Sequence, residues 1–248
     1  MLSAFADGVW YDEGPVQGPV GLRLSATMTV LRVADGLLVH SPLPLTAERR
    51  SAVESLGRVA HLYAPNTFHH SWLGEWSQAF PSATVHAPAE LGKKRGDLRI
   101  DRFHDRADAF DFGGYVTEVP IRGFRLVETA LVHRPGSTAV VTDLVHNIGR
   151  PTHPWTKFYT RLMGFYDRVA ISRVIRWTAF SDKGAARQSV DALLDHTFEG
   201  LLVGHGAPIP AAGRDALARA TAWLPAAPPR LRAATSQKSA LFSPKPCG

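Results

Sequence analysis

The chain has 248 residues, with 28 basic and 22 acidic side chains and a formal net charge of +6. Its 45% hydrophobic and 20% charged residues exclude a wholly disordered protein. No apolar run approaches the roughly 20 residues that span a membrane, and a single cysteine, Cys247, excludes internal disulfides and Cys-rich zinc modules. The N-terminus lacks the pattern of a secretory signal, so we expect a cytoplasmic protein.

The positive charge is concentrated in two segments. Residues 146–180 hold six basic residues and one acidic residue, and residues 225–248 hold four basic residues and no acidic one. Because the rest of the chain is nearly neutral, we expect no nucleic-acid partner. Residues 225–248 also contain five prolines and no hydrophobic periodicity, which predicts a disordered tail. Removal of this tail should leave the melting temperature nearly unchanged.

The first half of the chain predicts strands that alternate with helices. The expected strands are Met28–Val33, Leu37–His40, His61–Ala64 and Thr84–Ala87, and the expected helices run from the cap Thr46 to about Leu56 and around Gly74–Phe80. The Asp-Gly pair in Ala34-Asp35-Gly36 is typical of a hairpin turn. This alternation indicates a layered α/β sheet.

The second half predicts closely spaced strands and then helices. The expected strands are 115–121, 125–133, 138–146 and 200–204, and the expected helices are about 158–169, 185–195 and 214–223. Arg134-Pro135-Gly136-Ser137 predicts a tight turn that makes a hairpin of the second and third strands. Phe158, Leu162, Phe165 and Val169 form one apolar helical stripe, which Gly164 is able to interrupt.

Five of the eleven histidines lie at or near the ends of predicted strands, where layered α/β folds build their sites. These are His69, His70, His133, His146 and His205. By contrast, His40, His61 and His86 lie in apolar strands, and we expect them to be packing residues.

Three of these histidines and one aspartate suit metal ligation. His69 and His70 are adjacent in a loop, so they either bind one cation, zinc or iron, or remain solvated. Asp143 ends an apolar strand and either caps the next turn or faces a site. His205 lies between two glycines, which allow a sharp turn that exposes the imidazole.

The segments HLYAPNTFHHSWLGEW, VETALVHRPGSTAVVTDL and LLVGHGAPI resemble, in this order, motifs of the metallo-β-lactamase superfamily. More narrowly, MTVLRVADGLLVHSPLPLT and APNTFHHSWLGEW look like the DUF4336 domain family, a divergent branch of that superfamily. The resemblance covers about Thr27 to Trp223. It implies an α/β fold, a four-layer αββα sandwich, as a single domain over residues 1–224 with a basic helical insert at about 146–180.

The chain departs from the superfamily's HxHxDH motif. In one alignment Asn66 and Phe68 stand at the first two histidines, and His70 and Ser71 stand at the last two positions. After a slip of one residue, His69 and His70 stand at the last two positions, and in both alignments the first two histidines are absent. Asp143 and His205 match the bridging aspartate and the final histidine. The resemblance therefore implies one ion, zinc or iron, bound by His69, His70, Asp143 and His205, with Asp143 and His205 as the catalytic pair.

Further residues are candidates for contacts around the ion or the substrate. These are Asn66, Glu75, His133, His146 and Arg161. Glu75 either accepts a hydrogen bond from a ligand imidazole or begins a helix, and His133 and His146 are either spare ligands, proton shuttles or structural residues.

Two functions are compatible with this pattern. The first is a metal-dependent hydrolase with a single ion and a small substrate, which would be anionic if arginines such as Arg161 line the pocket. The second is a catalytically inactive member of the fold that binds a ligand or a partner, including a second copy in a homodimer, through its apolar helical stripe.

Overall fold

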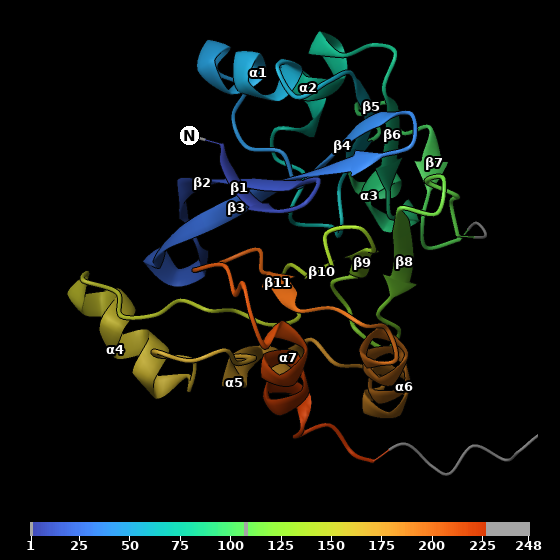
Figure 1. The fold of residues 1–248 in the computed structure, drawn as a ribbon. Helices are drawn as coiled ribbons and strands as arrows, with labels where there is room; N and C mark the ends of the chain where they lie inside the picture. Colours follow the sequence, from blue (N-terminus) through green and yellow to red (C-terminus); the bar gives the residue numbers. More distant parts are fainter. Residues whose placement is uncertain (1, 107–108, 227–248) are drawn as a thin grey trace, which may run out of the picture.

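Two β-sheets pack face to face in the computed structural model, which describes residues 2–106 and 109–226 (Figure 1). Within these residues the first sheet contains, in spatial order, β1 (Ser3–Ala6), β2 (Val9–Gln17), β3 (Arg23–Val33), β4 (Gly36–His40), β5 (Val59–Tyr63), β6 (Thr84–Ala87) and β7 (Arg102–Phe103). The second sheet contains β11 (Gly200–Leu202), β10 (Thr138–Val140), β9 (Thr129–His133) and β8 (Val116–Pro120). A 3-10 turn, η1 (Pro19–Gly21), connects β2 to β3.

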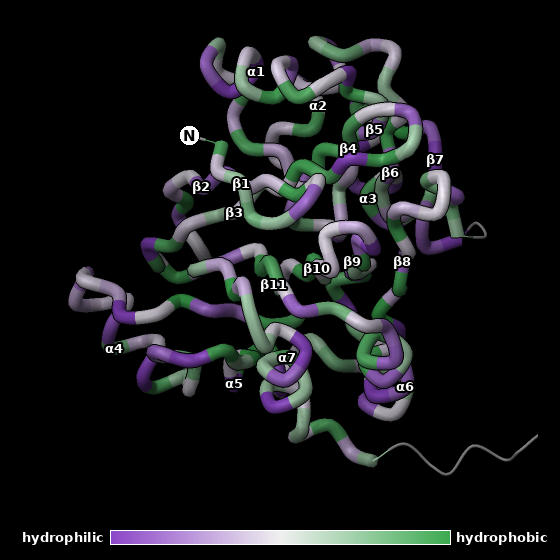
Figure 2. Tube along the Cα trace, viewed as in Figure 1, coloured by the Kyte–Doolittle hydropathy of each residue, from purple (hydrophilic) through white to green (hydrophobic). Residues whose placement is uncertain are grey.

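Helices cover the outer faces of both sheets. The helices beside the first sheet are α1 (Ala47–Glu54), α2 (Leu73–Ala79) and α3 (Ala89–Lys94). Those on the side of the second sheet are α4 (Pro154–Leu162), α5 (Arg173–Thr178), α6 (Lys183–Leu194) and α7 (Gly213–Thr221) (Figure 1). Along α6 and α7 hydrophilic and hydrophobic residues alternate, as expected for helices with one buried face (Figure 2).

Three apolar clusters separate the layers. One joins the first sheet to its helices through Trp76, another lies between the sheets around Leu131, and the third joins the second sheet to α6 and α7 through Leu193 and Leu217. The protein is therefore a single αββα sandwich, which confirms the expected fold class.

Local signals in the sequence account for several elements. The Asp35-Gly36 turn joins β3 and β4 as an antiparallel pair, and the Thr46 hydroxyl caps α1 by accepting a hydrogen bond from the Arg49 N–H at 3.1 Å. The predicted helix over 158–169 is wrong in its second half, because α4 ends at Leu162 and Gly164 adopts a left-handed φ of +77°. Strands β1 and β2 were not predicted from the sequence.

Two further expectations concern the ends of the chain and membranes. The predicted tail, 225–248, lies outside the described residues except for its first two positions. Among the helices that the structure describes, none has the length and hydropathy needed to cross a membrane.

Buried histidines occupy the inner face of the first sheet. His40, Tyr63 and His86 pair in register across β4, β5 and β6, and both imidazoles stack on the Tyr63 ring at centroid distances of 5.8 and 5.6 Å. His86 Nε2 lies 3.0 Å from Nδ1 of His61, which in turn lies next to Asp35. Burial, with smaller contributions from His61 and Arg102, lowers the pKa of His86 to about 2.

We expect His86 to make the fold sensitive to acid. Its pKa is lowered on folding, so below about pH 6.5 the unfolded chain binds a proton that the folded chain does not, and stability is lost as the pH falls. In urea unfolding between pH 6 and 4, His86→Gln should reduce the pH slope of the unfolding free energy by about 1.4 kcal/mol per pH unit. An unchanged slope in a folded variant would contradict this assignment.

Candidate metal centre

The loop after β5 turns His69 toward the interior through the Asn66 side chain. Oδ1 of Asn66 accepts hydrogen bonds from the backbone N–H groups of Phe68 at 2.8 Å and His69 at 2.9 Å. This local turn is a typical use of asparagine. Nδ2 of Asn66 donates to Oδ2 of Asp143 at 2.8 Å. Asn66 therefore holds the carboxylate of Asp143 in place.

A buried carboxylate shapes the turn that carries Asp143. Glu128, just before β9, is 1% exposed and accepts hydrogen bonds from three consecutive backbone N–H groups. The donors are Thr142 at 2.8 Å, Asp143 at 2.7 Å and Leu144 at 3.0 Å. Burial and the nearby charge of Asp143 raise the pKa of Glu128 to about 7.

His205 follows β11 in a turn that requires glycine. Gly206 has a φ of +99°, and a Cβ atom there would lie 2.0 Å from the backbone oxygen of Asn147. The turn places Nδ1 of His205 2.7 Å from the backbone oxygen of Ser25 in β3. Because a carbonyl oxygen only accepts hydrogen bonds, Nδ1 carries the proton and Nε2 of the neutral ring is left with its lone pair.

Three side chains converge at this edge of the sandwich. Nε2 of His69 lies 3.5 Å from Oδ2 of Asp143, and Nε2 of His205 lies 3.6 Å from Oδ1. One nitrogen or oxygen atom from each of the three residues lies within 4.8 Å of the others. Nδ1 of His69 is 2.8 Å from the hydroxyl of Ser41, which fixes the ring.

These separations suit a bound cation better than direct hydrogen bonds. Zinc ligands at 2.0–2.2 Å in tetrahedral geometry are about 3.4 Å apart, close to both nitrogen–oxygen distances. Two imidazoles and one carboxylate are also the donor set of many zinc and iron sites. His69, Asp143 and His205 therefore form a candidate metal site.

The carboxylate of Asp143 and the imidazole of His205 shift one another's pKa values toward the charged forms. Although burial opposes ionisation of Asp143, His69 and His205 hold the pKa of its carboxyl well below the usual range. Burial likewise disfavours protonated His205, but contact with Asp143 gives a net rise in the pKa of this imidazole. The site thus keeps an anionic carboxylate between two imidazoles, as a cation would require.

His146 lies directly beside this triad. Its Nε2 is 4.0 Å from Oδ1 of Asp143, and its ring stacks on His205 at a centroid distance of 5.5 Å. Nδ1 is buried and has no hydrogen-bond partner among the described residues. Burial and the neighbouring His205 lower the pKa of His146 to about 4, so this imidazole is neutral at physiological pH.

His70 is turned away from the triad. Its Nδ1 lies 3.5 Å from Nη1 of Arg95, and the group of converging ligand atoms does not include it. We expected His69 and His70 to share one coordination sphere, but only His69 faces Asp143. The cause is local, because the Asn66 turn directs the two successive side chains to different sides.

The remaining candidates lie away from the metal site. Glu75 accepts a hydrogen bond from the Leu45 N–H at 2.8 Å in the first turn of α2. His133, at the far end of β9, contacts the backbone oxygen of Arg32 at 2.9 Å. The guanidinium of Arg161 stacks over the ring of Tyr166 at 4.5 Å.

Three residues of the site escaped sequence analysis. Ser25 and Ser41 orient the two ligand imidazoles, and Glu128 holds the Asp143 turn. The serines left no local signal. Glu128 had one, since it is a lone acid in the apolar segment 126–132.

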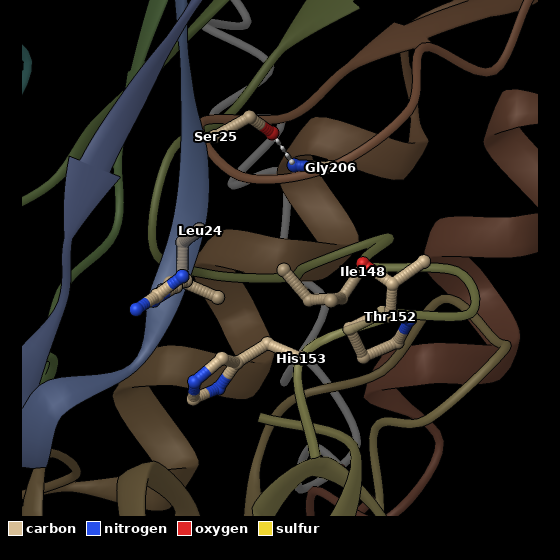
Figure 3. A pocket seen from close by; sticks show the side chains of 8 residues that line it. Leu24, Ser25, Ile148, Thr152, His153 and Gly206 are labelled. Carbon is tan, nitrogen blue, oxygen red and sulfur yellow. Dashed lines mark hydrogen bonds between the residues drawn. The ribbon is translucent and has the colours of Figure 1, made fainter. Parts of the chain in front are cut away.

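Two cavities border the site. One of about 470 Å³ contains the triad, and one of about 380 Å³ lies behind His205. In the second cavity Ser25 accepts a hydrogen bond from the Gly206 N–H at 3.3 Å, and Ile148, Thr152 and His153 come from the loop before α4 (Figure 3). The triad therefore lies at the base of the larger cavity.

Solved structures share this architecture at low sequence identity. A metallo-β-lactamase from Pontibacter korlensis is 11% identical, with a TM-score of 0.63 over 90% of this chain and 98% of its own. Metallo-β-lactamase FIM-1 from Pseudomonas aeruginosa, in a mono-zinc form, is 9% identical, with a TM-score of 0.60 over 90% and 94% of the two chains.

A third structure widens the range of relatives. The metal-soaked Flv1 flavodiiron core from Synechocystis sp. PCC6803 is 12% identical, with a TM-score of 0.64 over 90% of this chain and 60% of its own. No family model matches the sequence, and no curated protein matches it. The structural similarity shows that this chain has the metallo-β-lactamase fold.

Proposed function

We propose that the protein is a metal-dependent hydrolase that acts on a small molecule with one ion held by His69, Asp143 and His205. The observation that carries this proposal is the convergence of two imidazole nitrogens on one carboxylate, at 3.5 and 3.6 Å, at the base of a cavity. Three protein ligands leave a coordination position open, which is typical of catalytic rather than structural sites.

A bound zinc or iron ion would supply an activated water near neutral pH and would polarise a carbonyl group. Asp143 would provide the negative charge of the site, while Ser25 and Ser41 fix which nitrogen of each imidazole faces the ion. His146 is neutral and adjacent, so it is placed to accept a proton or to hold the substrate.

The structural neighbours support a metal site in this fold. FIM-1 is described in a mono-zinc form, and the Flv1 core is described as metal-soaked and flavodiiron. In both alignments of this loop with the motif the first two histidines are absent, so the ligands that they would give to a second ion are missing. Both zinc and iron remain candidates for the one site.

We also infer that the chain belongs to the divergent branch of the superfamily that the DUF4336 family represents. We further infer that the protein is located in the cytoplasm. The two sequence segments behind the first inference meet at the site, because one includes Ser41 and the other includes Asn66 and His69. The single cysteine supports the second inference.

Metal content and hydrolysis together test the proposal. Protein purified without added metal should contain about one zinc or iron ion per chain by elemental mass spectrometry. His205→Ala should remove the ion and reduce hydrolysis of an ester and lactone panel by at least about a hundredfold, because it removes a direct ligand. His196→Ala, which removes an imidazole after α6, is the matched control and should retain both.

Two outcomes would overturn the proposal. Wild-type protein that takes up neither zinc nor iron would contradict the metal site. Protein that binds one ion but turns over no substrate would contradict the enzyme and favour the ligand-binding alternative.

A further inference from the structure

The cavity above the triad has apolar walls. Its lining comes from the turn between β2 and β3, the loop after β5, and the segment from α4 to α5. Val20, Leu22, Leu24, Phe68, Phe165 and Val174 are among the side chains that form these walls. Of the ligand-type groups in the lining, His69, Asp143, His146 and His205 gather at the base, and His70 lies apart from them.

Cationic side chains are missing from this lining. Of the described residues that border the cavity, none is a lysine or an arginine, and the acid among them is Asp143. The nearby arginines are engaged elsewhere, since Arg168 donates to the backbone oxygen of Gly164 and Arg173 to that of Leu162. Lys94 and Arg95 contact the lining residues Phe68 and His70, and they donate to the backbone oxygen of Thr67 and to the carboxylate of Asp97. Arg176 donates to the backbone oxygen of Ile171. A charged substrate group that lies against these walls, away from the ion at the base, would thus lose its hydration without gaining an ion pair from the lining.

The entrance of the cavity is apolar as well. Val20 is 64% exposed and Phe68 is 58% exposed, and both belong to the lining. Exposed apolar residues at the rim of a cavity indicate a surface that an apolar ligand covers. The volume of about 470 Å³ is in the range of sites for drug-sized molecules.

We propose, on the basis of the hydrolase function above, that the substrate is an ester or lactone with a large, uncharged and apolar acyl group. The acyl group occupies the apolar walls, and the carbonyl carbon reaches the base near Asp143 and His205. In the reaction the oxygen of water forms a bond to the carbonyl carbon, the bond from this carbon to the alkoxy oxygen breaks, and the leaving oxygen gains a proton.

Binding of a neutral dye tests the cavity without the metal. Nile red should bind to protein stripped of metal with a chelator. Val174→Asp, at a position that lines the cavity and is 36% exposed, should weaken binding at least about tenfold, because it puts a charge in an apolar wall. Trp177→Asp is the matched control on the same helix; this residue is 71% exposed and is not part of the lining, so binding should stay within about twofold.

A second variant guards against loss of folding. Val20 has a left-handed φ of 52°, which aspartate tolerates better than valine, so Val20→Asp should fold and should also weaken dye binding. With metal present, 4-nitrophenyl octanoate should be hydrolysed at least about tenfold more efficiently than the acetate, given the extra apolar surface buried. Val174→Asp should remove this preference and spare the acetate.

The results separate this inference from the proposed function. Failure of the stripped protein to bind Nile red, or a preference for the acetate or for 4-nitrophenyl phosphate, would overturn the apolar substrate while leaving the hydrolase intact. Dye binding that depends on Val174, without any metal-dependent hydrolysis, would support the apolar cavity and overturn the hydrolase.

Discussion

Asp143→Asn should leave the protein folded but lower its affinity for zinc by more than about a hundredfold, and hydrolysis should fall with it. Asparagine has nearly the same shape, and its amide oxygen is able to accept the hydrogen bond that Asn66 donates. The variant loses the negative charge that lies between His69 and His205. Loss of a group that merely orients a ligand costs about 10–100-fold in metal affinity, so loss of the anionic ligand itself should cost more.

Zinc titration by calorimetry, with protein stripped by a chelator, measures this effect. Asp182→Asn is the matched control, because Oδ1 of Asp182 accepts a hydrogen bond from Ala185 at the start of α6 and asparagine caps a helix equally well. Unchanged zinc affinity in Asp143→Asn would show that the cation binds elsewhere or not at all. Equal losses in both variants would point to a general defect in folding.

The sequence predicted those site residues that carry a local signal. His205 was recognisable because glycines flank it, and the structure explains the second glycine through the left-handed φ of Gly206. Asp143 was recognisable because it follows an apolar strand. The neighbours His69 and His70 could not be separated, because their directions depend on hydrogen bonds from two backbone N–H groups to Asn66.

Long-range contacts explain what sequence analysis missed. Ser25 and Ser41 lie 180 and 28 residues from the imidazoles that they contact, and neither serine belongs to a recognisable motif. Strands β1 and β2 were missed because glycine and proline interrupt the alternation of β2, yet the turn from β2 to β3 supplies a wall of the cavity. Arg161 was assigned to substrate from charge alone, whereas its direction is set by the ring of Tyr166.

Glu128 illustrates how one buried side chain connects stability with function. The sequence predicts that it lies within the strand 125–133, but Val127 has a left-handed φ of 55° and β9 begins only at Thr129. Glu128 therefore lies outside the strand, and its carboxylate reaches the turn that carries Asp143, which precedes α4. Among the described residues, no other side chain accepts hydrogen bonds from three successive backbone N–H groups of this turn.

Glu128→Ala should therefore destabilise the fold by about 3–9 kcal/mol, since three buried N–H groups lose their acceptor and each costs about 1–3 kcal/mol. Glu128→Gln should cost less, because one oxygen remains while the amide nitrogen faces backbone donors. Urea unfolding measures both values. Glu54→Ala, which removes an exposed ion pair with Arg50, is the control and should cost only about 0.3–0.5 kcal/mol.

Metal affinity distinguishes a structural role from a positioning role for Glu128. If its carboxylate positions Asp143, Glu128→Gln should lose at least about tenfold in zinc affinity under conditions where it is fully folded. An unchanged zinc affinity would mean that the hydrogen bond from Asn66 and the remaining backbone hold Asp143 without help. If Glu128→Ala lowered the free energy of unfolding by no more than Glu54→Ala does, this would contradict the three hydrogen bonds themselves. Buried N–H groups that lack an acceptor destabilise a fold by more than that.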